Sequence, residues 1–279
     1  MNLTPSVLDL EWAEVEAKIK GFIKDYVEKS KAKGIVLGLS GGIDSCTAAA
    51  LSALAIGGDK VLGLLLPEKE TYNKKDVEDA KLVAEKFGLK TETIDITPAL
   101  EEIQKTIPVF NPEDKLCKGN LKARLRMVYL YYYANRLNLI VCGSSDKSET
   151  MIGYFTKWGD VAADIAPLMD LYKTQVRKLA KHIGLPEEIV QKPASPALWP
   201  GQMAEEEIGI KYELLDLILY GLEHFMKTEE IARQLSLEKA TVDKVKERWK
   251  SMEHKRRMPL TTKIQYRAAG FDFRLPYTK

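Results

Sequence analysis

The sequence predicts a doubly wound α/β fold with a mainly parallel sheet, followed by a C-terminal helical section. Short apolar runs alternate with helix-like segments through the first half of the chain, and a glycine-rich loop (residues 40–45) follows the first run. Apolar strands need cover on both faces, and parallel neighbours need crossover connections, which the helical segments supply. We expect a single domain over 1–279, with an α/β core at about 30–184, an ordered proline-rich loop at 185–202 and helices over 203–279.

The first predicted elements are a helix, a strand and a second helix. Apolar residues recur at steps of three and four over 12–26, which is typical of an amphipathic helix. Residues 34–39 form a short apolar run with β-branched members, which predicts a strand, and 47–51 favour a helix. The glycine-rich loop lies between them. It therefore follows the carboxyl end of a strand, where doubly wound sheets bind their ligands.

The same alternation continues along the chain. Strands are predicted at 61–66, 91–96 and 139–142, and helices at 73–87 and 119–137. Residues 143–145 follow the last strand, so they should lie at the same sheet edge as the glycine-rich loop. Four prolines between 186 and 200 exclude a regular helix there. Beyond them, helices are expected at 212–225, 228–235 and 238–255.

The composition of the chain argues against several classes of protein. The chain is 45% hydrophobic, and 42 basic residues nearly cancel 40 acidic ones, leaving a net charge of +2 and no global field for a nucleic-acid backbone. Three scattered cysteines and three separate histidines argue against a disulfide framework and a zinc site. No signal peptide is visible, and no stretch reaches the roughly 20 apolar residues that span a bilayer. We expect a cytoplasmic protein that binds neither nucleic acid nor membrane.

The glycine-rich loop has the character of a phosphate site. A loop that leaves a strand and enters a helix exposes unpaired backbone N–H groups, and the helix dipole adds positive charge. The two glycines allow close approach of the backbone, and the two serines add hydroxyl donors. The P-loop signature is absent, since no lysine closes the loop. The loop reads Ser40, Gly41, Gly42, Ile43, Asp44 and Ser45.

Asp44 indicates a divalent cation. A carboxylate inside a phosphate nest repels the ligand unless a cation lies between them, so we assign Asp44 to magnesium. The alternative is that Asp44 only caps the following helix while the glycines make a tight turn. The full hexapeptide after a β-rich run favours the magnesium interpretation.

The hexapeptide SGGIDS after an apolar strand resembles the pyrophosphate loop of the ATP pyrophosphatase superfamily, whose members split ATP between the α and β phosphates. Four later segments resemble NAD synthetase in particular: KGNLKARLRM (118–127), GSSDKSETMIGYFTKWGDVAADIAPLMDLYKTQV (143–176), KPASPALWPGQMAEEEIGIKYELLD (192–216) and MEHKRRMP (252–259). The resemblance implies an adenine nucleotide alpha hydrolase-like fold. It also implies a ligase that uses ATP and ammonia to amidate deamido-NAD through an adenylated intermediate, releasing AMP and pyrophosphate.

The resemblance also implies roles for individual residues. Glu149 would complete the magnesium site with Asp44. ATP would be bound by Gly38, Leu39, Ser40, Gly41, Gly42, Ile43, Asp44, Ser45, Ser144, Lys173 and Ser195. Deamido-NAD would be bound by Arg124, Lys157, Asp164, His254 and Lys255. Taken singly, Glu149, Lys173, Arg124 and the basic run at 254–257 could equally be solvated surface residues.

The chemistry implied by the resemblance needs a base, because ammonium must lose a proton before it attacks. Asp160 and Asp164 are the candidates for this role. Only about 30 residues precede the first predicted strand, which leaves no room for a glutaminase domain, so ammonia is expected from solution or from a separate protein. Family members are homodimers, and the aromatic run at 129–133 could serve such an interface. Val161, Pro196 and Ala197 depart from the family pattern in loops near the substrates.

Two other functions remain open from the sequence. Residues 228–249 have the look of a DNA-binding helix-turn-helix with Ile231, Leu235, Val242 and Val245 as its core, although acidic residues are mixed into the second helix. A different amidating or thiolating enzyme of the same superfamily is the closer alternative.

Overall fold

The computed structural model describes residues 2–268 and 272. A four-stranded parallel sheet has the order β3-β2-β1-β4, with strands β1 (Ile35–Gly38), β2 (Val61–Leu65), β3 (Lys90–Thr93) and β4 (Ile140–Val141). Ile35 pairs with Val61 on one side and with Ile140 on the other. The strand order reverses between β1 and β4, so a ligand crevice is expected there, outside the carboxyl ends of both strands.

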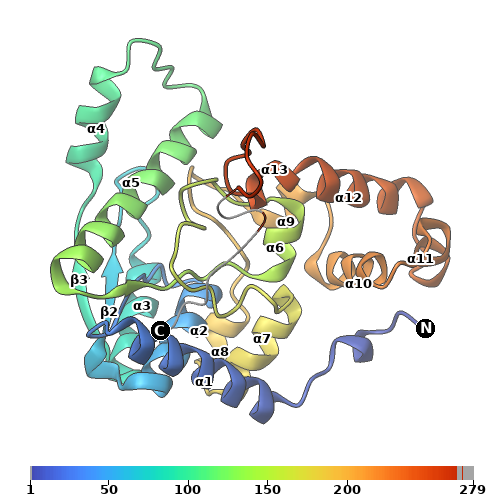
Figure 1. The fold of residues 1–279 in the computed structure, drawn as a ribbon, viewed down its shortest axis with the longest axis horizontal. Helices are drawn as coiled ribbons and strands as arrows, with labels where there is room; N and C mark the ends of the chain where they lie inside the picture. The colour runs from blue at the N-terminus through green and yellow to red at the C-terminus, as the bar shows by residue number, and fades with distance from the viewer. Residues whose placement is uncertain (1, 269–271, 273–279) are drawn as a thin grey trace.

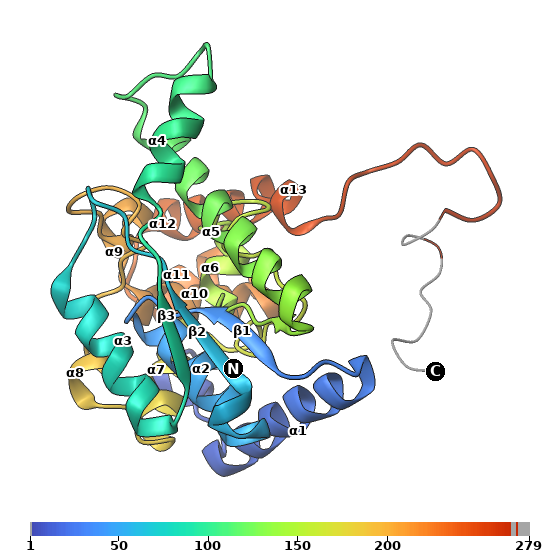
Figure 2. The ribbon, with the colours of Figure 1, turned by 90° about the vertical axis from the view of Figure 1, so that its left-hand side faces the viewer.

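Helices cover both faces of the sheet, which confirms the predicted fold class (Figure 1; Figure 2). One face packs against α1 (Trp12–Ser30), α2 (Ile43–Ile56), α3 (Lys74–Phe87) and α7 (Lys173–His182). The other face packs against α4 (Thr97–Thr106) and α5 (Lys115–Leu137). Along β1, Ile35 and Leu37 enter the first core and Val36 enters the second, as the two-residue period of a strand requires.

A third core builds the helical section (right in Figure 1). It joins α6 (Lys147–Ile152), α9 (Ala204–Ile208), α10 (Tyr212–Glu223), α11 (Thr228–Gln234) and α12 (Lys239–Ser251) to the 3-10 helix η1 (Pro5–Leu8). Ile231, Val242 and Val245 are buried in it and Leu235 packs against it. The predicted hairpin core is therefore correct, and these residues serve internal packing.

The remaining short elements are η2 (Gly58–Lys60), α8 (Glu187–Val190) and α13 (Glu253–Arg256). Helix α8 lies inside the interval predicted as loop, because Pro186 can occupy the position before a helix. The last predicted helix is broken at Met252, where α12 ends and α13 begins. No helix among residues 2–268 and 272 has the length and apolar character needed to cross a membrane.

One expectation about the strands is wrong. The strands were expected to be apolar throughout, but β3 reads KTET and all four of its residues are exposed. It is an edge strand that pairs with β2 alone, so its side chains need not be buried on both faces.

Candidate functional site

A cavity of ≈ 950 Å³ opens at the carboxyl end of the sheet. This volume is at the upper end of the range for small-molecule sites, which suits a large ligand or two ligands at once. The loops after β1, β2 and β4 line it, together with segment 192–199 and the last turn of α12. The glycine-rich loop and Gly143–Ser145 both contribute, as their positions after two neighbouring strands predicted.

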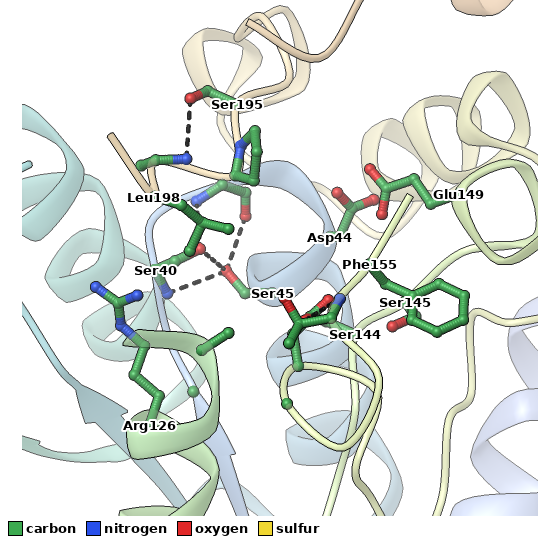
Figure 3. Close-up of a pocket in the computed structure, with 18 of the residues that line it drawn as sticks. Ser40, Asp44, Ser45, Arg126, Ser144, Ser145, Glu149, Phe155, Ser195 and Leu198 are labelled. Atoms are coloured by element: carbon green, nitrogen blue, oxygen red, sulfur yellow. Dashed lines mark hydrogen bonds between the residues drawn. The ribbon is translucent and has the colours of Figure 1, made fainter. Parts of the chain in front are cut away.

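The glycine-rich loop, which is the predicted pyrophosphate loop (residues 40–45), is held in shape by its own serines (Figure 3). The hydroxyls of Ser40 and Ser45 lie 2.9 Å apart, the Ser40 N–H donates to Ser45 Oγ at 3.2 Å, and Ser45 Oγ donates to the Gly42 carbonyl at 3.0 Å. Gly41 has φ +78°, and a Cβ there would lie 2.1 Å from the carbonyl oxygen of Asp76. Both the backbone angle and this contact require glycine. The loop delivers the N-terminus of α2 to the cavity, where an anion is favoured.

Next to this loop lies an acidic centre, made of Asp44, Asp146 and Glu149 around the ammonium of Lys173. Lys173 Nζ lies 2.6 Å from Asp44 Oδ2, 2.8 Å from Asp146 Oδ2 and 2.9 Å from Glu149 Oε1. Lys173 and Asp146 are completely buried, whereas Asp44 and Glu149 each keep about a fifth of the side chain exposed, toward the cavity.

Burial and the closeness of the carboxyl groups shift the pKa values of the residues in the acidic centre. Burial raises the pKa of Asp146 well above its usual value, against the pull of Lys173, and Glu149 and Asp44 raise it further. Burial and the nearby Asp44 raise the pKa of Glu149, while Lys173 and the hydroxyl of Tyr212 oppose this rise. Burial opposes the charge of Lys173, but the three carboxylates raise its pKa far above the ordinary value. Lys173 is therefore a permanent cation in this centre.

The acidic centre fits a divalent cation. The centre has two more carboxyl groups than ammonium groups, and one oxygen from each of the three acids lies within 4.8 Å of the others. Asp44 Oδ2 accepts from Lys173, while Asp44 Oδ1 is buried without a hydrogen-bond partner. Carboxylate oxygens are the ligands that Mg²⁺ takes in proteins. Asp44 and Glu149, which the sequence predicted as a pair, would hold it together with Asp146.

The family model for NAD synthase matches residues 15–259. The chain belongs to this family. An NH(3)-dependent NAD(+) synthetase of Methanocaldococcus jannaschii is 51% identical over 252 residues, covering 90% of this chain and 97% of the relative.

Solved structures of the NAD synthase family share the fold. The NMN synthetase of Francisella tularensis superposes with a TM-score of 0.81 at 35% identity, covering 91% of this chain and 99% of that one. The NH3-dependent NAD synthetase of Campylobacter jejuni superposes with a TM-score of 0.76 at 31% identity, covering 91% and 100%.

Four of the residues predicted to bind the dinucleotide lie together in this NAD synthase chain. Arg124 donates from Nε and Nη2 to the Lys157 carbonyl at 3.3 and 3.2 Å, and Lys157 Nζ donates to the His254 carbonyl at 2.7 Å. Lys255 Nζ reaches the carbonyls of Gly153 and Phe155 at 2.8 and 2.7 Å. Of the four, Lys255 lines the cavity. The others form a basic cluster beside it, and their contacts with a substrate stay a prediction.

The two candidate bases occupy different surroundings. Asp160 lines the cavity, where the enclosing protein raises the pKa of its carboxyl although the Thr156 N–H donates to it at 2.8 Å. Asp164 does not line it, and its carboxylate accepts from the Val141 N–H at 2.7 Å and from Tyr131 Oη at 3.4 Å. The geometry favours Asp160 over Asp164 as the group that takes a proton.

Of the remaining residues predicted to bind ATP, some line the cavity and one does not. Ser144 and Ser195 line the cavity, and Ser195 Oγ donates to the Gln202 carbonyl at 2.6 Å. Lys173 lies beneath the cavity wall among the carboxylates, so its contact with the triphosphate stays a prediction.

Sequence reasoning missed several residues of the site. Asp146 sits in the same motif as Glu149 and caps α6 by accepting from the Glu149 N–H at 2.8 Å. Lys192 joins the proline-rich loop to the pyrophosphate loop, with Nζ 3.0 Å from the Gly41 carbonyl and 2.7 Å from Asp79 Oδ2. Arg126, for which the sequence predicted no role, lines the cavity. An acidic residue three positions before a predicted metal ligand was a usable signal for Asp146.

Proposed function

We infer that this chain is an ammonia-dependent NAD synthetase, a ligase that forms a C–N bond. It amidates deamido-NAD with ammonia and consumes ATP, through an adenylated intermediate, releasing AMP and pyrophosphate. The observation that carries this conclusion is the acidic centre beside the pyrophosphate loop, in one cavity large enough for a nucleotide and a second substrate. Membership of the NAD synthase family narrows the substrate.

The residues of the chain act mainly by positioning. The N-terminus of α2 would hold the β and γ phosphates of ATP, which leave together as pyrophosphate when the nicotinate carboxylate attacks the α phosphorus. Mg²⁺, held by Asp44, Asp146 and Glu149, would neutralise the charge on the leaving pyrophosphate. Lys173 would keep the three carboxylates from repelling one another. Lys255, which also lines the cavity, would meet the anionic dinucleotide.

The second step replaces AMP with ammonia. We propose that Asp160 accepts the proton that ammonium loses, since Asp160 lines the cavity and its surroundings raise the pKa of its carboxyl, which makes it a stronger base than an ordinary aspartate. Asp160→Asn is expected to lower the rate with ammonium and to flatten its rise with pH. An unchanged rate and pH profile would exclude Asp160 as the base.

The decisive assay supplies deamido-NAD, magnesium ATP and ammonium, and measures NAD and AMP. Equal amounts of NAD and AMP are expected. Formation of ADP, or of no NAD, would overturn the proposal. Because the Francisella relative is an NMN synthetase, the mononucleotide counterpart of deamido-NAD should be assayed in parallel as a substrate. If kcat/KM is higher for this mononucleotide than for deamido-NAD, the product of the enzyme is NMN and not NAD.

We also propose that the chain is a homodimer that contacts its copy through α5. Within the predicted aromatic run, Tyr129, Tyr131 and Tyr133 pack against the core, whereas Tyr132 is 68% exposed. Val128, one turn earlier on the same face, is 54% exposed. Light scattering should give the mass of two chains, and Tyr132→Glu should give that of one. A monomeric wild type would exclude the proposal.

We also propose a cytoplasmic location. Cys46, Cys117 and Cys142 are free thiols, which suits a reducing compartment.

A further inference from the structure

Two buried polar residues of α10 face the acidic centre from the helical section. Tyr212 and Asp216 are completely buried and lie one turn apart on the same side of the helix. Burial of a carboxylate and a phenol is costly unless each has partners. Both have partners, and those partners belong to α6 and α7, the helices that carry Glu149 and Lys173.

Tyr212 holds Glu149 directly. Its hydroxyl donates to Glu149 Oε1 at 3.1 Å, the same oxygen that lies 2.9 Å from Lys173 Nζ. The ring of Tyr212 also lies against the lysine, with Nζ 5.3 Å from the ring centroid. Burial and the neighbouring carboxylates raise the pKa of Tyr212, so the hydroxyl keeps its proton and remains a donor. One side chain thus sets the position of both a predicted metal ligand and its counter-ion.

Asp216 joins the two helices at their starts. Its Oδ1 accepts from Ser148 Oγ at 2.5 Å and its Oδ2 accepts from the Thr174 N–H at 2.9 Å. Ser148 Oγ in turn accepts from the Lys173 N–H at 2.9 Å. Ser148 precedes Glu149 and Thr174 follows Lys173. The chain of bonds therefore fixes the distance between the backbone positions from which Glu149 and Lys173 extend.

We propose that Tyr212 and Asp216 are positioning residues for the acidic centre, so that α10 and the helical section hold Glu149 and Lys173 in the geometry that binds a divalent cation. The inference rests on the proposed function for the identity of that cation, Mg²⁺. Groups that orient metal ligands change metal affinity or activity by about 10- to 100-fold when they are removed. Residues that only fill a core change stability without this effect.

The test compares Tyr212→Phe with a matched control, Tyr172→Phe. Tyr172 also donates its hydroxyl to a carboxylate of α10, Glu223 Oε2 at 2.7 Å, and is also buried, but it does not touch the acidic centre. Binding of Mn²⁺, measured by electron paramagnetic resonance without substrates, should weaken about 10-fold or more in Tyr212→Phe and stay at the wild-type value in Tyr172→Phe. Equal Mn²⁺ affinity in the two variants would overturn the proposal.

A second variant separates positioning from folding. Asp216→Asn keeps the shape of the side chain, so the protein should fold, but its amide cannot accept from both Ser148 and Thr174 as the carboxylate does. Mn²⁺ affinity and kcat with deamido-NAD should both fall, with the circular dichroism spectrum unchanged. If wild-type protein makes no NAD, the proposed function fails while the Mn²⁺ measurement still decides the inference. If wild type makes NAD and both variants bind Mn²⁺ normally, the inference alone fails.

Discussion

Lys122 and Lys173 are both completely buried, and each is surrounded by carboxylates, yet the two clusters differ in charge. Lys122 Nζ lies 2.7 Å from Glu68 and 2.8 Å from Glu70, and Lys118 lies 3.0 Å from Glu70, so two ammonium groups meet two carboxylates. Around Lys173, one ammonium meets three carboxylates. When every group is counted in its ordinary charged form, the first cluster is neutral and the second has an excess of two carboxylates.

This difference separates a structural ion pair from a ligand site. Lys122 also donates to the Leu198 carbonyl at 3.1 Å, so the neutral cluster ties α5 and the loop after β2 to the proline-rich loop over the cavity. It needs nothing further. The cluster at Lys173 has the excess of carboxylates that the proposed divalent cation would offset. Burial of a charged residue is therefore not by itself a sign of function. An excess of buried charge of one sign is the stronger indication of a ligand site.

The largest expected effect tests the neutral cluster. Lys122→Met leaves Glu68, which is 2% exposed, without its counter-ion. Breaking a buried pair in this way costs about 3–5 kcal/mol, so urea unfolding should show a loss of that size. Lys118→Met is the control, since it removes the more exposed ammonium of the same cluster and should cost about 1 kcal/mol or less. If both variants lost the same free energy of unfolding, Lys122 would not be the main counter-ion of the two glutamates.

Asp44→Asn should act on activity instead. Loss of one carboxylate from the charged cluster is expected to lower kcat/KM by about 10²–10³-fold, because in the proposed mechanism this cluster holds the cation that offsets the charge on the leaving pyrophosphate. Stability should not fall, since one of three repelling carboxylates is removed. Glu70→Gln, in the neutral cluster, should retain nearly full activity. An inactive Glu70→Gln variant would break the distinction between the clusters.

Addition of Mg²⁺ should stabilise the fold through the charged cluster. A ligand that binds the native state alone adds about 2.7 kcal/mol at a concentration of 100 Kd. Thermal unfolding of the wild type and of Glu70→Gln should therefore shift upward with Mg²⁺, and that of Glu149→Gln should shift much less. A shift of equal size in all three proteins would place the cation elsewhere.

The smallest effect is a difference in pH dependence. The hydrogen bond from Lys122 lowers the pKa of Glu70 from 4.5, so its contribution to stability is present above pH 4.5 and is lost as the pH falls through the lowered value. Burial raises the pKa of Glu149, so the stability it confers is present below pH 4.5 and is lost as the pH rises through the raised value.

Urea unfolding across pH 3–8 without divalent cations measures this difference. Glu70→Gln should remove part of the acid loss, by about 1 kcal/mol or less because Glu70 is partly exposed. Glu149→Gln should gain stability relative to wild type as the pH rises. Changes of the same sign in both variants would contradict the comparison.

Local patterns account for most of the fold. The alternation of apolar strands with amphipathic helices is encoded residue by residue, so the sheet, α1, α3 and α5 could be predicted from it. Helices α4, α6, α7 and α9 were not among the predicted elements. Helices α6 and α9 are short, so the periodicity covers too few turns, whereas α4 and α7 have ten residues each and were missed just after a predicted strand and at the end of a family motif. The edge strand β3 was misjudged because its exposure depends on strand order.

The sequence by itself determined the class of fold and the place of the glycine-rich loop after a strand, because each depends on a short motif or on a pattern repeated along the chain. The family resemblance predicted that Asp44 and Glu149 act together, and the structure places them in one cluster. Only the tertiary structure decided that Asp146 and Lys173 complete the same centre and that Tyr212 and Asp216 support it. Lys173 lies 129 residues from Asp44, and the sum of charges at a buried point depends on which distant segments meet there. Desolvation and charge balance are properties of that meeting point, and no single segment contains them.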